Sequence, residues 1–128
     1  MNAKPINPSL AVTAQITAAD VAEIAAAGFK TIICNRPDGE TSDQTPFSAI
    51  KSAAETASLS AHYLPTITGQ VSEADGRAFG EIMASVPHPV LAYCRSGTRS
   101  ATMWGLSQAG QLPADAILAA VQGAGYDL

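Results

Sequence analysis

The chain has 128 residues, of which 47% are hydrophobic and 14% are charged, and this length predicts a single compact domain over residues 1–128. Eleven acidic against seven basic residues give a net charge of -4, which disfavours binding to a nucleic-acid backbone. With two cysteines and no apolar run near the roughly 18 residues of a membrane span, we expect a cytoplasmic protein, neither disulfide-stapled nor membrane-bound.

Short β-branched or aromatic runs alternate with alanine-rich stretches along the chain, and this alternation predicts a parallel sheet covered by helices. In chain order, the strands are expected at 10–14, 30–34, 62–64 and 89–93. The helices are expected to begin near Thr17, Thr45, Ser72, Ser100 and Pro113. The fold class indicated is a three-layer α/β domain.

Three of the expected helices have a recognisable start signal. Thr17 with Asp20, and Ser72 with Asp75, have the spacing of a capping box, in which each side chain bonds to the other residue's backbone. Thr45 precedes a proline, which is typical of a cap followed by the first helical turn.

The segment with the most chemical content follows the last expected strand. It reads Cys94-Arg95-Ser96-Gly97-Thr98-Arg99-Ser100 and leads directly into a helix. A cysteine there faces the converging N–H groups of a tight turn and a helix start, which stabilise a thiolate. We expect Cys94 to be the nucleophile, Arg99 to bind an anionic group, and the Ser100 hydroxyl to donate to the sulfur. The other loop members are expected to bind substrate: Arg95, Ser96, Gly97 and Thr98.

A second polar loop, 35–39, leaves the end of the strand at 30–34. Ligands of open α/β sheets collect outside the carboxyl ends of the strands, which is where both loops are expected. Arg36 and Asp38 therefore either contact substrate or the cysteine loop, or form a solvated turn. Cys34 is expected to be a buried hydrophobe, with a resolving role for its thiol left open.

These segments resemble cysteine-dependent phosphatases and rhodaneses, and in particular a bacterial family of phosphatase-like domains found in beta-lactamase hydrolase-like proteins. The similar segments are 8–12, 27–29, 33–40 and 93–100. The resemblance implies the fold of dual-specificity phosphatases, with four parallel strands in the order 1-4-2-3. It also implies a partner, because family members occur fused to metallo-β-lactamase-like persulfide dioxygenases.

Three departures from the phosphatase pattern favour sulfur chemistry. Only four residues separate Cys94 from Arg99, as in rhodaneses, so the loop suits one sulfur atom better than three phosphoryl oxygens. Tyr93 replaces the histidine that commonly precedes a phosphatase cysteine. The segment 65–70 contains no aspartate to protonate a leaving alkoxide, whereas a thiol or sulfite leaving group needs little protonation.

The sequence thus predicts a sulfurtransferase that moves sulfane sulfur from thiosulfate or glutathione persulfide to a thiol or cyanide through a Cys94 persulfide. One alternative is a cysteine-dependent phosphatase acting on phosphotyrosine or another ester, with Asp38 as a relocated acid. A further alternative is a non-enzymatic persulfide carrier or thiol sensor. His62 and His88 stand apart from other ligand residues, so we expect no metal, and the chemistry needs no cofactor.

Overall fold

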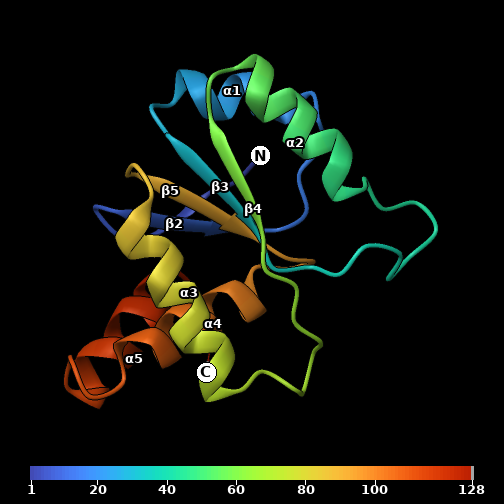
Figure 1. The fold of residues 1–128 in the computed structure, drawn as a ribbon. Coiled ribbons are helices and arrows are strands. Elements are labelled where there is room, and N and C mark those ends of the chain that lie inside the picture. Colours follow the sequence, from blue (N-terminus) through green and yellow to red (C-terminus); the bar gives the residue numbers. More distant parts are fainter. Residues whose placement is uncertain (128) are drawn as a thin grey trace.

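Four parallel strands form the centre of the structure, a computed structural model that describes residues 1–127 (Figure 1). They are β2 (Leu10–Thr13), β3 (Thr31–Cys34), β4 (Ser60–Tyr63) and β5 (Val90–Tyr93). Their order in the sheet is β2-β5-β3-β4, which confirms the expected order 1-4-2-3. The expected count of four is wrong, because a fifth strand, β1 (Lys4–Asn7), pairs antiparallel with β2 at the sheet edge.

The edge strand β1 carries little of the pattern that predicts a strand. It contains a proline, Pro5, and only Ile6 among its residues is buried. Proline cannot donate a hydrogen bond to a neighbouring strand and is therefore tolerated mainly at sheet edges. The pairing with β2 also shifts register between Pro5 and Asn7. Pairing with the next strand along the chain, and not a hydrophobic run, makes this segment a strand.

The register of the parallel strands brings three strand ends to one edge of the sheet. Tyr93 at the end of β5 lies opposite Thr13 of β2 and Cys34 of β3. The Asn35 amide then donates to the Tyr93 carbonyl at 2.8 Å, and the Gln15 amide donates to the Arg95 carbonyl at 3.2 Å. The loops that follow these strands therefore start side by side, as the binding edge of an open α/β sheet requires.

Helices cover both faces of the sheet and make the three expected layers (Figure 1). On one face lie α1 (Asp20–Ala26) and α2 (Phe47–Thr56), and on the other lie α3 (Glu73–Ser85), α4 (Thr98–Gln108) and α5 (Ala114–Gly123). Alternation along β3 buries Ile32 in the core under α1 and α2, and Ile33 in the core under α3 and α4. Within residues 1–127, every helix is too short or too polar to cross a membrane.

Of the three expected start signals, one holds, one is displaced and one fails. Ser72 and Asp75 form a capping box at α3. Thr17 and Asp20 exchange the same pair of bonds, but α1 begins at Asp20 with Ala19 as its N-cap, so the bonds close the turn before the helix. At α2 the first residue is Phe47, and its amide donates to the Asp38 carboxylate at 2.8 Å. Asp38, nine residues earlier in the chain, therefore caps α2 in place of Thr45, because its carboxylate accepts from the Phe47 amide, which has no partner within the helix.

The substitution Gly76→Ala is expected to destabilise the fold by about 1–3 kcal/mol, because α3 and α4 pack too closely there for a side chain. A Cβ at the buried Gly76 would lie 2.5 Å from Leu106 Cβ and 3.0 Å from its carbonyl carbon. Urea unfolding measures the loss.

The matched control is Gly80→Ala, one turn further along α3. A Cβ there would lie 3.4 Å from Ser107 Cβ, and alanine has the higher helix propensity, by about 1 kcal/mol. We expect this variant to be as stable as the wild type or more so. Equal losses in the two variants would contradict the close-packing explanation.

Candidate active site

The Cys94 thiol lies in a tight loop between β5 and α4. Cys94 directly follows Tyr93, the last residue of β5, and its side chain is buried with 1% exposed. The Gly97 amide donates to Cys94 Sγ at 3.0 Å. Gly97 immediately precedes α4, a helix of 11 residues, so the sulfur lies at the positive end of a helix dipole. This arrangement stabilises negative charge on the sulfur and suits a nucleophile.

Gly97 is required at its position by both its backbone and its surroundings. Its φ is 98°, in the left-handed region that side chains disfavour. A Cβ would also overlap the hydroxyl of Tyr126, from the tail after α5. That hydroxyl donates to the Ser96 carbonyl at 3.3 Å. The tail therefore packs directly on the loop that holds the thiol.

Ser96 and Thr98 complete the loop at the start of α4. The Ser96 hydroxyl donates to Thr98 Oγ1 at 3.1 Å and accepts from the Thr98 amide at 3.4 Å. These bonds fix the Ser96 side chain against the first residue of α4, next to the Gly97 amide that donates to Cys94 Sγ.

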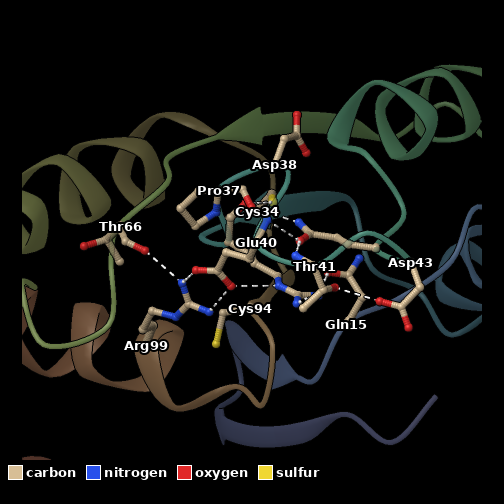
Figure 2. A network of polar contacts seen from close by, with 12 residues as sticks. Gln15, Cys34, Pro37, Asp38, Glu40, Thr41, Asp43, Thr66, Cys94 and Arg99 are labelled. Atoms are coloured by element: carbon tan, nitrogen blue, oxygen red, sulfur yellow. Dashed lines mark hydrogen bonds and ion pairs between the residues drawn. The ribbon is translucent and has the colours of Figure 1, made fainter.

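Arg99 lies in the first turn of α4 and is buried, and its guanidinium is already paired (Figure 2). Its Nη1 donates to Glu40 Oε2 at 2.6 Å and to the Thr66 carbonyl at 2.9 Å, and its Nη2 donates to Glu40 Oε1 at 2.9 Å. This fork-to-fork geometry is the one by which arginine binds a planar or tetrahedral anion. The place expected for the substrate's anionic group is therefore taken by a carboxylate of the chain itself.

Arg36 is the second buried cation of the site, and it does not form the solvated turn that one reading of the sequence allowed. Its Nε donates to Glu40 Oε1 at 2.9 Å. Its Nη1 and Nη2 donate to Gln15 Oε1 at 3.1 Å and to Thr41 Oγ1 at 3.3 Å. Through Glu40, the loop after β3 is tied to the cysteine loop (Figure 2).

Glu40 was missed as a site residue by the sequence reasoning, although it belongs to the segment that resembles the family. Hydrogen bonds and charge from Arg99 and Arg36 hold the pKa of the Glu40 carboxyl at about 2, far below its usual range. Its spacing of four residues from Arg36 is no signal by itself, because the rule that pairs charges at that spacing holds on a helix and both residues lie in the loop between β3 and α2. At neutral pH this carboxylate is ionised and cannot serve as a proton donor.

Two expected site residues have different partners from those predicted. The Ser100 hydroxyl donates to Asn35 Oδ1 at 2.8 Å and not to the Cys94 sulfur, so the predicted bond to the thiolate is wrong. Asn35 in turn donates to the Leu64 carbonyl at 2.9 Å. Asp38 accepts from the Phe47 amide, so it caps α2. In these positions Ser100 ties α4 to the loop that follows β3, and the Asp38 carboxylate caps α2.

Two further titratable groups near the loop, Asp75 and Cys34, have structural partners. The Asp75 carboxylate accepts from the Ser72 amide at 3.0 Å and from Thr66 Oγ1 at 3.2 Å, and these bonds lower its pKa. The Cys34 thiol donates to the Arg36 carbonyl at 3.3 Å, and burial raises its pKa. Both cysteines are free thiols. Within residues 1–127, no three His, Cys, Asp or Glu side chains come together as metal ligands.

Arg95 is the exposed cation of the cysteine loop. Its side chain forms no hydrogen bond or ion pair in the part of the chain that the structure describes. It lines a pocket of about 240 Å³ together with Arg36 and Asp43. The pocket walls are completed by Gln15, Thr41 and Gln44.

Residues 2–111 match the phosphatase-like domain of beta-lactamase hydrolase-like proteins, and the chain belongs to this family. A beta-lactamase hydrolase-like protein of Agrobacterium fabrum is 40% identical over 109 residues, which are 85% of this chain and 25% of that protein. One from Xylella fastidiosa is 34% identical over 125 residues, which are 96% of this chain and 29% of that protein. The chain thus spans between a quarter and a third of the length of these relatives.

Solved structures show the same fold. A candidate phosphatase from Neisseria meningitidis Z2491 is 38% identical, with a TM-score of 0.87 over 96% of this chain and 88% of that one. A candidate phosphatase from Shewanella putrefaciens CN-32 is 18% identical, with a TM-score of 0.73 over 90% of this chain and 77% of that one. The expected cysteine-phosphatase-like fold is therefore confirmed.

Replacing Glu40 by glutamine is expected to destabilise the fold at neutral pH and to lose that effect in acid. The folded-state pKa of Glu40 is about 2, against an ordinary value of 4.5. The carboxylate therefore contributes stability above about pH 4.5, and the contribution disappears as the pH falls toward 2. The Tm values of wild type and Glu40→Gln, measured from neutral pH into acid, should converge.

The control for this prediction is Glu55→Gln, which removes an exposed carboxylate near the end of α2. Its Tm should follow that of the wild type across the same pH range. A Tm difference between wild type and Glu40→Gln that stays constant into acid would show that Glu40 does not act through its charge.

Proposed function

We propose that this member of the phosphatase-like family is a sulfurtransferase in which Cys94 carries sulfane sulfur as a persulfide. The donor is thiosulfate or the persulfide of a small thiol such as glutathione, and the acceptor is a second thiol or cyanide. The reducing cytoplasm that we propose for the chain supplies such thiols. The catalytic residue is Cys94, and the surrounding loop binds the sulfur.

The observation that carries this proposal is that, within residues 1–127, the acidic side chains Glu40, Asp38 and Asp75 of the loops and helix starts around the site already have structural partners. Glu40 is held ionised between two arginines. Asp38 caps α2, and Asp75 caps α3. A phosphatase needs an acid to protonate a departing alkoxide, whereas sulfite or a thiolate leaves without one. The lack of a general acid is therefore expected to slow sulfur transfer much less than hydrolysis of a phosphate ester.

The first chemical step is attack of the Cys94 thiolate on the outer sulfur of the donor. A new S–S bond forms at Cys94 Sγ while the S–S bond of the donor breaks, and its electron pair leaves with sulfite or with a thiolate. The acceptor thiolate then attacks the outer sulfur of the Cys94 persulfide and releases the Cys94 thiolate. Sulfur changes carrier twice, no external oxidant is consumed, and the scheme requires ping-pong kinetics.

The Gly97 amide, which lies 3.0 Å from Cys94 Sγ, is the group that stabilises negative charge as the sulfur is attacked and released. Four residues separate Cys94 from Arg99, and the loop they form is shorter than a phosphate cradle. This length supports transfer of one atom over transfer of a phosphoryl group. A persulfide dioxygenase is the partner that we propose as consumer of the product.

A second candidate function is a cysteine-dependent phosphatase, and the comparisons favour it by name. The solved structure that is 38% identical is described as a candidate phosphatase, and the family carries the description phosphatase-like. The same Cys94 would then form a phosphocysteine. A persulfide carrier or thiol sensor without turnover is a third candidate, which rests on the same buried thiol.

Incubation with thiosulfate or glutathione persulfide is expected to add one sulfur atom to the chain at Cys94. Mass spectrometry of the intact chain and of its peptides detects the addition. It should be absent in Cys94→Ser and present in Cys34→Ala, which keeps the nucleophile and replaces the other thiol. An addition that survives in Cys94→Ser would contradict the proposal.

Parallel assays separate the candidate functions. Sulfur transfer to cyanide or glutathione should exceed hydrolysis of an aryl phosphate, whose leaving group needs little protonation and so makes the fewest demands on a phosphatase. Dominant hydrolysis of the aryl phosphate, lost in Cys94→Ser, would establish the phosphatase in place of the sulfurtransferase. Loading of Cys94 without transfer to any acceptor would establish the carrier.

A further inference from the structure

We infer that Glu40 and the pocket beside Arg95 make the site selective for persulfides of zwitterionic organic thiols over small dianions such as thiosulfate. This inference rests on the proposed function and narrows its donor class. Glu40 occupies the guanidinium of Arg99 and so weakens the binding of dianions there. Arg95 and Asp43 bind the charged end of the organic donor.

Glu40 competes directly with any oxyanion for the guanidinium of Arg99. Its two carboxylate oxygens accept from both terminal nitrogens of Arg99, at 2.6 and 2.9 Å. A sulfonate or phosphoryl group would need the same two donors. Arg99 is 6% exposed, and the Thr66 carbonyl accepts a further bond from Nη1, which leaves little room for a second anion.

Glu40 also reduces the positive charge that a dianion would meet. The Glu40 carboxylate stays ionised over the whole neutral range, so Arg36, Arg99 and Glu40 together carry one net positive charge in place of the two that the arginines alone would carry. A dianion is therefore attracted less strongly than it would be by two unpaired guanidinium groups. The reacting S–S bond of an organic persulfide carries no oxyanion and so does not need the Arg99 fork.

The pocket beside the cysteine loop offers opposite charges to the rest of such a donor. Arg95 directly follows the nucleophile in sequence and is unpaired in the described chain, so it is free to bind a carboxylate. Asp43 lines the same pocket, and a hydrogen bond from Thr41 together with the charges of Arg36 and Arg95 lowers its pKa. An ionised Asp43 is suited to an ammonium group.

The size and amide lining of the pocket fit one end of a small thiol. Its volume of about 240 Å³ is below the roughly 300 Å³ at which sites for drug-sized ligands begin. Gln15 and Gln44 provide amide groups on the walls. Arg36 belongs both to these walls and to the Glu40 cluster, so the pocket adjoins the group that excludes dianions.

The test compares kcat/KM for sulfur transfer from three donors: glutathione persulfide, thiosulfate, and the persulfide of 2-mercaptoethanol, which has no charged end. We expect the wild type to prefer glutathione persulfide over both others by roughly tenfold or more, as one charged hydrogen bond provides. Arg95→Ala and Asp43→Asn should each narrow the preference for glutathione persulfide over 2-mercaptoethanol persulfide, mainly by raising KM.

Glu40→Gln should narrow the preference over thiosulfate, and inorganic sulfate should inhibit this variant more strongly than the wild type. Arg77→Ala, which removes an exposed cation on α3, is the matched control and should leave all three values unchanged. Glu40→Gln is also expected to lower the stability of the fold. The donor preferences of the wild type and of Asp43→Asn, which changes an exposed side chain, test the inference without that complication.

The possible results separate the inferred donor selectivity from the proposed sulfurtransferase activity. Loading of Cys94 by all donors with equal efficiency, or preferences that none of the three variants changes, overturns the inference and leaves the sulfurtransferase intact. Failure of every donor to load Cys94 overturns both.

Discussion

A single carboxylate between two buried guanidinium groups organises the reactive edge of this protein. Glu40 receives hydrogen bonds from Arg36 on its own loop and from Arg99 on α4. Without the Glu40 carboxylate, Arg36 and Arg99 would each be a buried cation with no ion-pair partner, and a buried, unpaired charge is destabilising. The loop after β3 and the start of α4 are therefore held in one arrangement, and the thiol between them has a fixed electrostatic environment.

The chemistry follows from what this arrangement supplies and what it withholds. It supplies an amide and a helix start next to Cys94 Sγ, which favour a charged sulfur. Within residues 1–127, Glu40 is ionised and occupies the guanidinium fork of Arg99, whereas phosphoryl transfer uses a neutral acid and a fork that is free to bind the phosphoryl group. The proposed transfer of a single sulfur atom by a phosphatase-like fold rests on these two features.

The sequence predicts those features that depend on local patterns. The alternation of strand and helix, the capping box at Ser72 and the placement of Cys94 at the end of a strand all rest on short-range signals, and the strand order rests on the family resemblance. It does not predict β1, whose strand character comes from its neighbour, or the Glu40 pair with Arg99, which joins residues 59 positions apart. Hydrogen-bond partners such as that of Ser100 depend on tertiary geometry, which no spacing rule encodes.

The contact of Tyr126 with the cysteine loop has a consequence for how the site is assembled. The strands and the loop itself lie earlier in the chain, but the tyrosine that closes over Gly97 lies in the tail that follows α5. The final packing of the Cys94 loop therefore requires the residues after α5 as well as the sheet, and shortening the chain before Tyr126 would expose Gly97 without altering a strand.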